Sequence, residues 1–101
     1  MSNPLLSDAE LTEALAGLTG WTRSGDTLTR TLQAPSFLDG IELVRQVAEV
    51  AETMNHHPDI DIRWRKLTFV LSTHDAGGLT GLDTALAQEI DRLAAKAGST
   101  D

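Results

Sequence analysis

The side chains best suited to proton transfer lie in one stretch of this chain. All three histidines, at positions 56, 57 and 74, fall between Glu52 and Asp83. An imidazole can gain or lose a proton near neutral pH without a large change in its surroundings. This spacing suggests a site for general acid–base chemistry, with the carboxylates of Asp75 and Asp83 close to His74 in the sequence.

Two of the imidazoles are placed by the end of a predicted helix. Glu52 and His56 are four residues apart, so both are expected on one helix face near the C-terminus, where a protonated imidazole is stabilised. Pro58 cannot continue a helix, and it pushes His57 toward extended geometry. With His74 at the end of a later strand, three imidazoles could converge on one ligand pocket.

Purely structural alternatives exist for each of these residues. Adjacent histidines at a helix end can simply complement the helix dipole, and a histidine in a loop is commonly polar surface. Asp83 follows Thr80 by three residues, which is the position of a capping carboxylate. Trp21 and Trp64 fit the core as well as the wall of a pocket. The spacing alone leaves these alternatives open.

A metal site is not expected from these residue types. Glu52 and the three histidines are all possible ligands, but adjacent histidines point in different directions. The chain contains no His-Glu-x-x-His motif. It also contains no cysteine, which removes thiolate ligands and disulfides.

Length and composition limit the remaining function classes. The 101 residues suffice for a single domain, residues 1–101, that folds without cross-links. A formal charge of −7 opposes binding to nucleic acid, and the basic cluster of Arg63, Arg65 and Lys66 is short. No apolar run reaches the ~20 residues of a membrane span. The N-terminus lacks the pattern of a secretion signal, so we expect a cytoplasmic protein.

Capping and turn signals define the first half of the fold. Ser7 begins a predicted amphipathic helix that ends at Gly17 or Gly20. An extended segment, a turn and an alternating strand then predict a β-hairpin over residues 21–33. Arg30 shares the apolar face of the second strand, which suggests that this face lies near a sheet edge or an interface.

The second half repeats this pattern with longer elements. Ser36 caps a helix to about Asn55, and its apolar stripe is wider than one covered face requires. Alternating strands follow at 59–64 and 67–74, and Thr80 then caps a last helix. The order α-β-β-α-β-β-α predicts an α+β protein in which three helices cover one face of an antiparallel four-stranded sheet.

The spacing of the candidate site residues resembles the signature of a known family. The run Glu52-x3-His56-His57-Pro58-x5-Trp64-x9-His74-x8-Asp83 is similar to that of the pterin-4a-carbinolamine dehydratases. Members of that family are also known as dimerisation cofactors of a hepatocyte nuclear factor. The flanking Thr-Met-Asn and Leu-Ser-Thr segments match family usage too, and the element order covers nearly the whole chain. Trp64 stands where many members have Tyr, which concerns only the fine shape of the pocket.

The resemblance implies dehydration of a 4a-hydroxytetrahydropterin to quinonoid dihydropterin and water, which recycles the pterin used by aromatic amino acid hydroxylases. It implies that His57 acts on a ring nitrogen and that His56 and His74 assist departure of the hydroxyl. Asp83 would orient His74, or cap its helix, or both. The residues expected around the substrate are Asn55, Pro58, Ser72, Thr73 and Asp75, with Glu52 and Trp21 beside them.

The same resemblance implies which partners the chain has. These are a pterin substrate and further copies of the chain, as a homodimer or homotetramer. No cofactor is expected because the reaction exchanges no electrons, and neither nucleic acid nor a membrane is expected. An alternative hypothesis from another class is a protein-interaction module with little or no catalytic role, in which the wide apolar stripe after Ser36 serves a partner.

Overall fold

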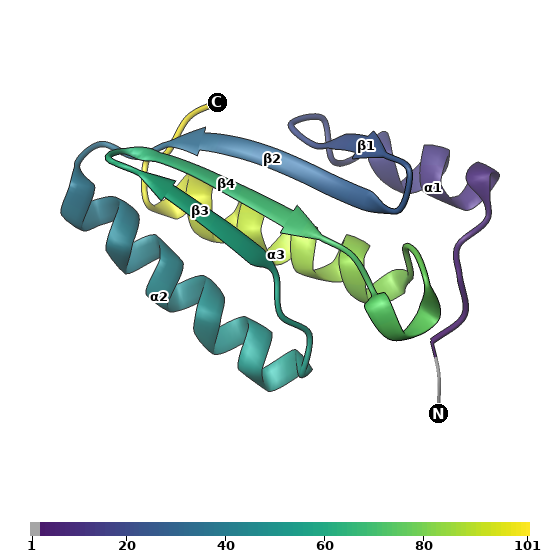
Figure 1. Ribbon diagram of the computed structural model, residues 1–101. Helices are drawn as coiled ribbons and strands as arrows, with labels where there is room; N and C mark the ends of the chain where they lie inside the picture. The colour runs from purple at the N-terminus through teal and green to yellow at the C-terminus, as the bar shows by residue number, and fades with distance from the viewer. Residues whose placement is uncertain (1–2) are drawn as a thin grey trace.

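Four antiparallel strands form a single sheet in the order β1-β2-β4-β3 (Figure 1). The computed structural model describes residues 3–101 and has the helices and strands in the predicted order, with a short 3-10 helix, η1, before the last helix. The predicted α+β class is therefore confirmed. The bounds are α1 Asp8–Leu15, β1 Thr22–Ser24, β2 Thr27–Gln33, α2 Phe37–Met54, β3 Asp59–Arg63, β4 Lys66–Leu71, η1 His74–Ala76 and α3 Gly81–Lys96.

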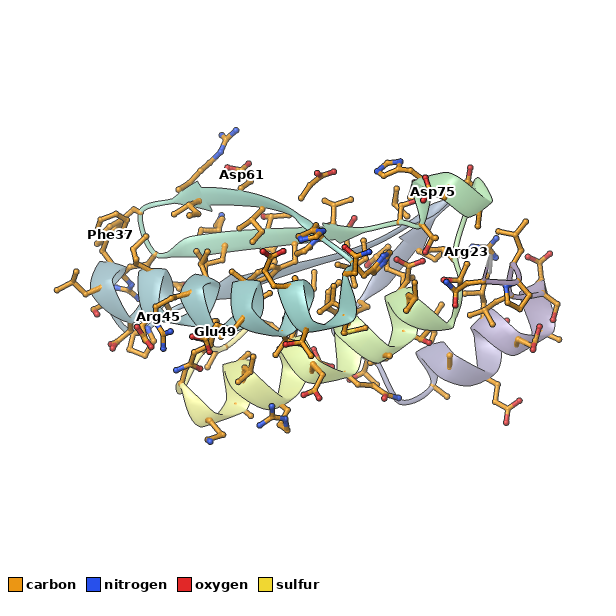
Figure 2. All side chains as sticks on the ribbon, turned by 90° about the horizontal axis from the view of Figure 1, so that it is seen from below. Arg23, Phe37, Arg45, Glu49, Asp61 and Asp75 are labelled. Carbon is orange, nitrogen blue, oxygen red and sulfur yellow. The ribbon has the colours of Figure 1, made fainter. Side chains whose placement is uncertain are left out.

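All three helices lie on one side of this sheet (Figure 2). Side chains alternate between the two faces of a strand, so every second residue of β2 and β4 points toward the helices. None of the helices within residues 3–101 is long and apolar enough to cross a membrane. The fully buried side chains of the sheet and of α3 are Leu28, Leu32, Leu67, Phe69, Leu71, Leu86 and Ile90.

The close packing of α2 on the sheet depends on a glycine in its first turn. Gly40 costs a helix about 1 kcal/mol relative to alanine. Here it is buried, and a Cβ at this position would stand 3.3 Å from the Cβ of Ala34 and 3.6 Å from a methyl group of Leu67. The missing side chain lets the helix approach β4, which explains why a weak helix former is found here.

The reciprocal caps predicted for the first and last helices are both present. The Ser7 hydroxyl accepts from the Glu10 amide at 3.1 Å, and the Glu10 carboxylate accepts from the Ser7 amide at 2.9 Å. The Ser7 amide, and after it the Ser7 hydroxyl, hold the pKa of Glu10 below its usual range. At the start of α3, Thr80 and Asp83 form the same arrangement.

Arg30 lies on β2 just beyond the residues that β1 covers, because the pairing of β1 with β2 ends at Thr29, so the expected sheet edge is nearby. β2 pairs with β1 on one side and with β4 on the other. The Arg30 guanidinium reaches Asp91 of α3 and also Asp101, the latter at 2.7 Å. Thr100 pairs with Gln33 through backbone hydrogen bonds, so the residues after α3 are held against β2. The Arg30 cation is tolerated on the helix-covered face of the sheet because these two carboxylates neutralise its charge.

Two aromatic substitutions distinguish the core from the surface. Phe69→Ala removes a fully buried ring and is expected to lower the free energy of unfolding by about 3–5 kcal/mol. Trp64→Ala removes a ring that is 71% exposed, with the Arg65 guanidinium 5.1 Å from its centroid, so the loss should stay below about 1 kcal/mol. Urea unfolding of both variants measures the difference, and equal losses would contradict this location of the core.

Candidate active site

An open hollow lies where the end of α2 meets the segment that follows β4. It consists of two adjoining depressions of about 300 Å³ and about 210 Å³, which share Asn55, His56, Thr73 and Asp75. The first is completed by Asn3, Met54, Ala76 and Leu82, and the second by His57, Ser72 and His74. All three histidines therefore line one hollow.

His56 enters this hollow because α2 ends one residue earlier than its sequence spacing suggests. The helix stops at Met54, and Asn55 adopts a left-handed conformation with φ of 51°, which asparagine tolerates at a helix end. The His56 amide then donates to the carbonyl of Ala51 at 3.0 Å. The turn directs the imidazole inward, where it is 8% exposed and its Nε2 lies 2.6 Å from Oδ1 of Asp83.

Asp83 is fully buried, and its carboxylate serves both the helix cap and the site. Oδ2 accepts from the Thr80 amide at 3.0 Å and from the Thr73 hydroxyl at 2.7 Å. Oδ1 faces His56, so the expectation that Asp83 orients His74 is wrong. A buried carboxylate is stable only when its oxygens are well satisfied, and these contacts supply that.

His57 points the other way, to the rim of the hollow. Its Nε2 contacts the carboxylate of Glu52, and both side chains are mostly exposed. The four-residue spacing predicted that Glu52 and His56 would be neighbours on one helix face. This prediction is wrong, because α2 does not continue far enough to carry His56 on the same face. An exposed pair of this kind contributes little to stability. The His57 imidazole is therefore open to a ligand.

His74 and Asp75 form the opposite rim. The predicted strand to residue 74 is too long, because β4 ends at Leu71 and His74 begins the 3-10 turn η1. Gly77 closes this turn with φ of 76°, and the Thr73 amide donates to the Gly78 carbonyl at 3.0 Å. The side chains of His74 and Asp75 are exposed, whereas Thr73, which directly precedes the turn, is buried.

Two other predicted residues lie outside the lining. Trp21 is a core residue, 6% exposed, and its indole N–H donates to Asp91 of α3 at 2.8 Å. Its expected place in the pocket is wrong. Pro58 is half-buried and follows His57 without bordering either depression.

Other residues also line or support the hollow, and the spacing of residues in the sequence did not indicate them. Met54 and Leu82 give it an apolar wall, and the buried Thr80 hydroxyl lies 2.9 Å from that of Thr73. The Thr80-x-x-Asp83 capping pattern was the one available signal for Thr80.

Charge in this region comes from carboxylates and imidazoles. Within residues 3–101 the lining of the hollow includes no Lys or Arg, so its histidines are the groups there that can carry positive charge. No three His, Asp or Glu side chains of this part of the chain gather closely enough to hold a metal ion.

A larger hollow exists elsewhere on the helical face and has different chemistry. It measures about 470 Å³, lies between α2 and α3, and contains no histidine. It is lined by residues with charges of both signs. These residues are Asp39, Glu42, Leu43, Gln46, Arg92, Leu93, Lys96 and Ala97. The hollow that contains the histidines is therefore the candidate active site.

The sequence matches a known family of proteins. The family model described as pterin 4 alpha carbinolamine dehydratase matches residues 4–93. A protein from Mycobacteroides abscessus is 61% identical over 87 residues, which is 86% of this chain and 93% of that protein. A protein from Nocardia farcinica is 61% identical over 94 residues, which is 93% of this chain and 99% of that protein. Both are provisionally named pterin-4-alpha-carbinolamine dehydratases.

Solved structures share the fold. A crystal structure from Brucella melitensis, described as a transcriptional coactivator/pterin dehydratase, has a TM-score of 0.86 and 29% identity, and the match covers 89% of this chain and 98% of that chain. A pterin dehydratase-like protein, described as a RuBisCO assembly factor, has a TM-score of 0.60 at 19% identity and shows the fold alone. Because the family model spans most of the sequence, the chain belongs to the pterin 4 alpha carbinolamine dehydratase family, a family of hydro-lyases.

Proposed function

We propose that this chain is a 4a-hydroxytetrahydrobiopterin dehydratase, which converts the carbinolamine to quinonoid dihydropterin and water. The observation that carries the proposal is the convergence of His56, His57 and His74 on one hollow. Loss of the hydroxyl requires an acid that protonates the departing oxygen and a base that takes a proton from the pterin ring. Imidazoles supply both near neutral pH, and such catalysis contributes about 10²–10⁴-fold.

The proposed roles follow the positions of the imidazoles. His57 stands on the rim and is open to a ligand, which suits the group that acts on a ring nitrogen. His56 and His74 then assist departure of the hydroxyl, with His56 held by Asp83. Thr73 is buried and its hydroxyl already donates to Asp83, so we assign it a role through Asp83 rather than direct contact with substrate.

Substrate binding is assigned to groups on the rim. The hydroxyl of Ser72, the amide of Asn55 and the carboxylate of Asp75 can hydrogen-bond to the amide-like edge of a pterin. Pro58 directly follows His57, and its rigid ring limits the backbone conformations that carry the imidazole. The proposed reaction involves proton transfer and no net oxidation or reduction, so the proposal requires no metal and no other cofactor. Recycling of tetrahydrobiopterin in the cytoplasm is the proposed setting.

His57→Ala tests the proposed chemistry. The variant is expected to dehydrate the carbinolamine at least about tenfold more slowly, because it lacks the proposed proton acceptor for the ring nitrogen. Decay of the carbinolamine is followed by absorbance, with circular dichroism as a check of folding. Glu13→Gln, an exposed residue of α1, serves as the control and should retain the wild-type rate.

The two possible failures of this test have different meanings. An unchanged rate in His57→Ala contradicts the role of that residue alone. A wild-type protein that does not exceed the uncatalysed rate contradicts the dehydratase proposal itself.

A second proposed function concerns association through α2. Three large apolar side chains are exposed in its first turns, and Figure 2 places Phe37 at the opposite end of the molecule from Asp75. Apolar clusters of this kind favour protein contacts. We therefore propose that copies of the chain associate through this surface as a homodimer or homotetramer, with the hollow left accessible. The exposed residues are Phe37, Leu38 and Ile41.

Ile41→Glu tests this association. Light scattering coupled to size-exclusion chromatography is expected to give a dimer or tetramer for the wild type and a smaller species for the variant, because the new carboxylate would be desolvated in the interface. Ala9→Glu adds the same charge to an exposed position of α1 and should not change the mass. A wild-type monomer at all concentrations would contradict the proposal. In a pull-down, a different protein that binds the His57→Ala variant and does not bind the Ile41→Glu variant would favour an interaction module.

A further inference from the structure

A continuous chain of hydrogen bonds connects the start of α3 to the wall of the hollow. The Leu82 amide donates to Oγ1 of Thr80 at 3.2 Å, and this hydroxyl lies 2.9 Å from Oγ1 of Thr73. Thr73 donates to Oδ2 of Asp83 at 2.7 Å, and Oδ1 lies 2.6 Å from Nε2 of His56. The threonines, Asp83 and His56 are all buried.

The number of available hydrogens gives this chain one direction. Thr80 Oγ1 accepts from an amide that can only donate, and its own single hydrogen is therefore available to Thr73. Thr73 in turn has one hydrogen, which goes to Asp83. Oδ2 of Asp83 also accepts from the Thr80 amide, so this oxygen accepts two hydrogen bonds. In an ionised carboxylate Oδ1 can likewise only accept.

An acceptor at Oδ1 determines which nitrogen of His56 carries the proton. We infer that Thr80 and Thr73 are positioning residues that hold Asp83 as an acceptor, so that neutral His56 keeps its hydrogen on Nε2 and exchanges protons with the ligand through Nδ1. The inference rests on the proposed function. In residues 3–101 Nε2 is the ring nitrogen of His56 that has a protein partner. No buried side-chain nitrogen of these residues lacks a partner, so Nδ1, which has none, is not buried. Nδ1 is therefore open to the hollow that His56 lines.

This arrangement gives His56 a defined step in the proposed reaction. In the imidazolium form, Nδ1–H passes its proton to the departing hydroxyl oxygen as the C–O bond breaks and the lone pair of the neighbouring ring nitrogen forms the C=N bond. The imidazole that remains is the Nε2–H tautomer, which is already bonded to Asp83. No tautomer change or ring rotation is needed between turnovers. The partner of a histidine fixes its tautomer in this way in other sites.

Loss of either threonine hydroxyl breaks the chain at a definite point. Thr73→Val removes a donor to Oδ2 and leaves the Thr80 hydroxyl without its acceptor. Thr80→Val removes the hydroxyl that donates to Thr73 and the acceptor of the Leu82 amide. In either variant the carboxylate has fewer constraints on its rotation, so His56 should sample both neutral tautomers.

Long-range ¹⁵N–¹H spectra of the His56 ring test this inference in the free protein. Wild type should show the Nε2–H tautomer, and Thr73→Val and Thr80→Val should show a mixture of tautomers. Thr80→Ser retains the hydroxyl and should restore the wild-type spectrum. Thr84→Val is the matched control, because among residues 3–101 the Thr84 hydroxyl bonds only to the Gly81 carbonyl in the same helix. The dehydration kcat of Thr73→Val should fall about tenfold, the effect that partners of functional histidines have in metal sites.

The outcomes separate this inference from the proposed function. A wild-type ring with its hydrogen on Nδ1 overturns the inference even if no variant folds, and so does a pure Nε2–H tautomer in both valine variants. Because the spectra need no substrate, the predicted tautomers in a protein without dehydratase activity would overturn the proposed reaction and leave the positioning role in place.

Discussion

The hydrogen bonds to the Asp83 carboxylate join three segments at one point of the molecule. His56 comes from the end of α2, Thr73 from the segment after β4, and Thr80 from the start of α3. A carboxylate that is removed from water loses its hydration, and only a full set of donors compensates for that loss. Movement of any one segment would leave charge unsatisfied, so the arrangement of the hollow is tied to the stability of the fold.

The two ends of α2 contribute to this arrangement in different ways. Near its first turn, Gly40 permits close contact with Ala34 and Leu67, which fixes the helix on the sheet. At its last turn, Asn55 reverses the chain and sends His56 into the interior. A helix transmits position along its length as a stiff rod, because its backbone hydrogen bonds are internal. The location of one imidazole therefore depends on packing at the far end of the same helix.

Local rules were enough to predict the elements and insufficient to predict the side-chain partners. Alternation and capping residues are properties of neighbouring positions, so the strands and helix starts followed from the sequence. Glu52 and His56 would have been neighbours only in a longer helix. Asn55, with Pro58 three residues on, was the available signal for the helix end, because asparagine tolerates the left-handed conformation there. Trp21 meets Asp91 across a separation of 70 residues, which no local pattern encodes.

The two tryptophans occupy contrasting environments, and this has an optical consequence. Trp21 is enclosed by the core and bonded to α3, while Trp64 stands 71% exposed on the β3–β4 turn with φ of 53°. The emission of the intact protein is accordingly a sum of a shielded and a hydrated indole. Replacement of Trp64 by phenylalanine leaves Trp21 as the single tryptophan, inside the fold. The fluorescence of that variant reports on the core and on the packing of α3 against it, without an added dye.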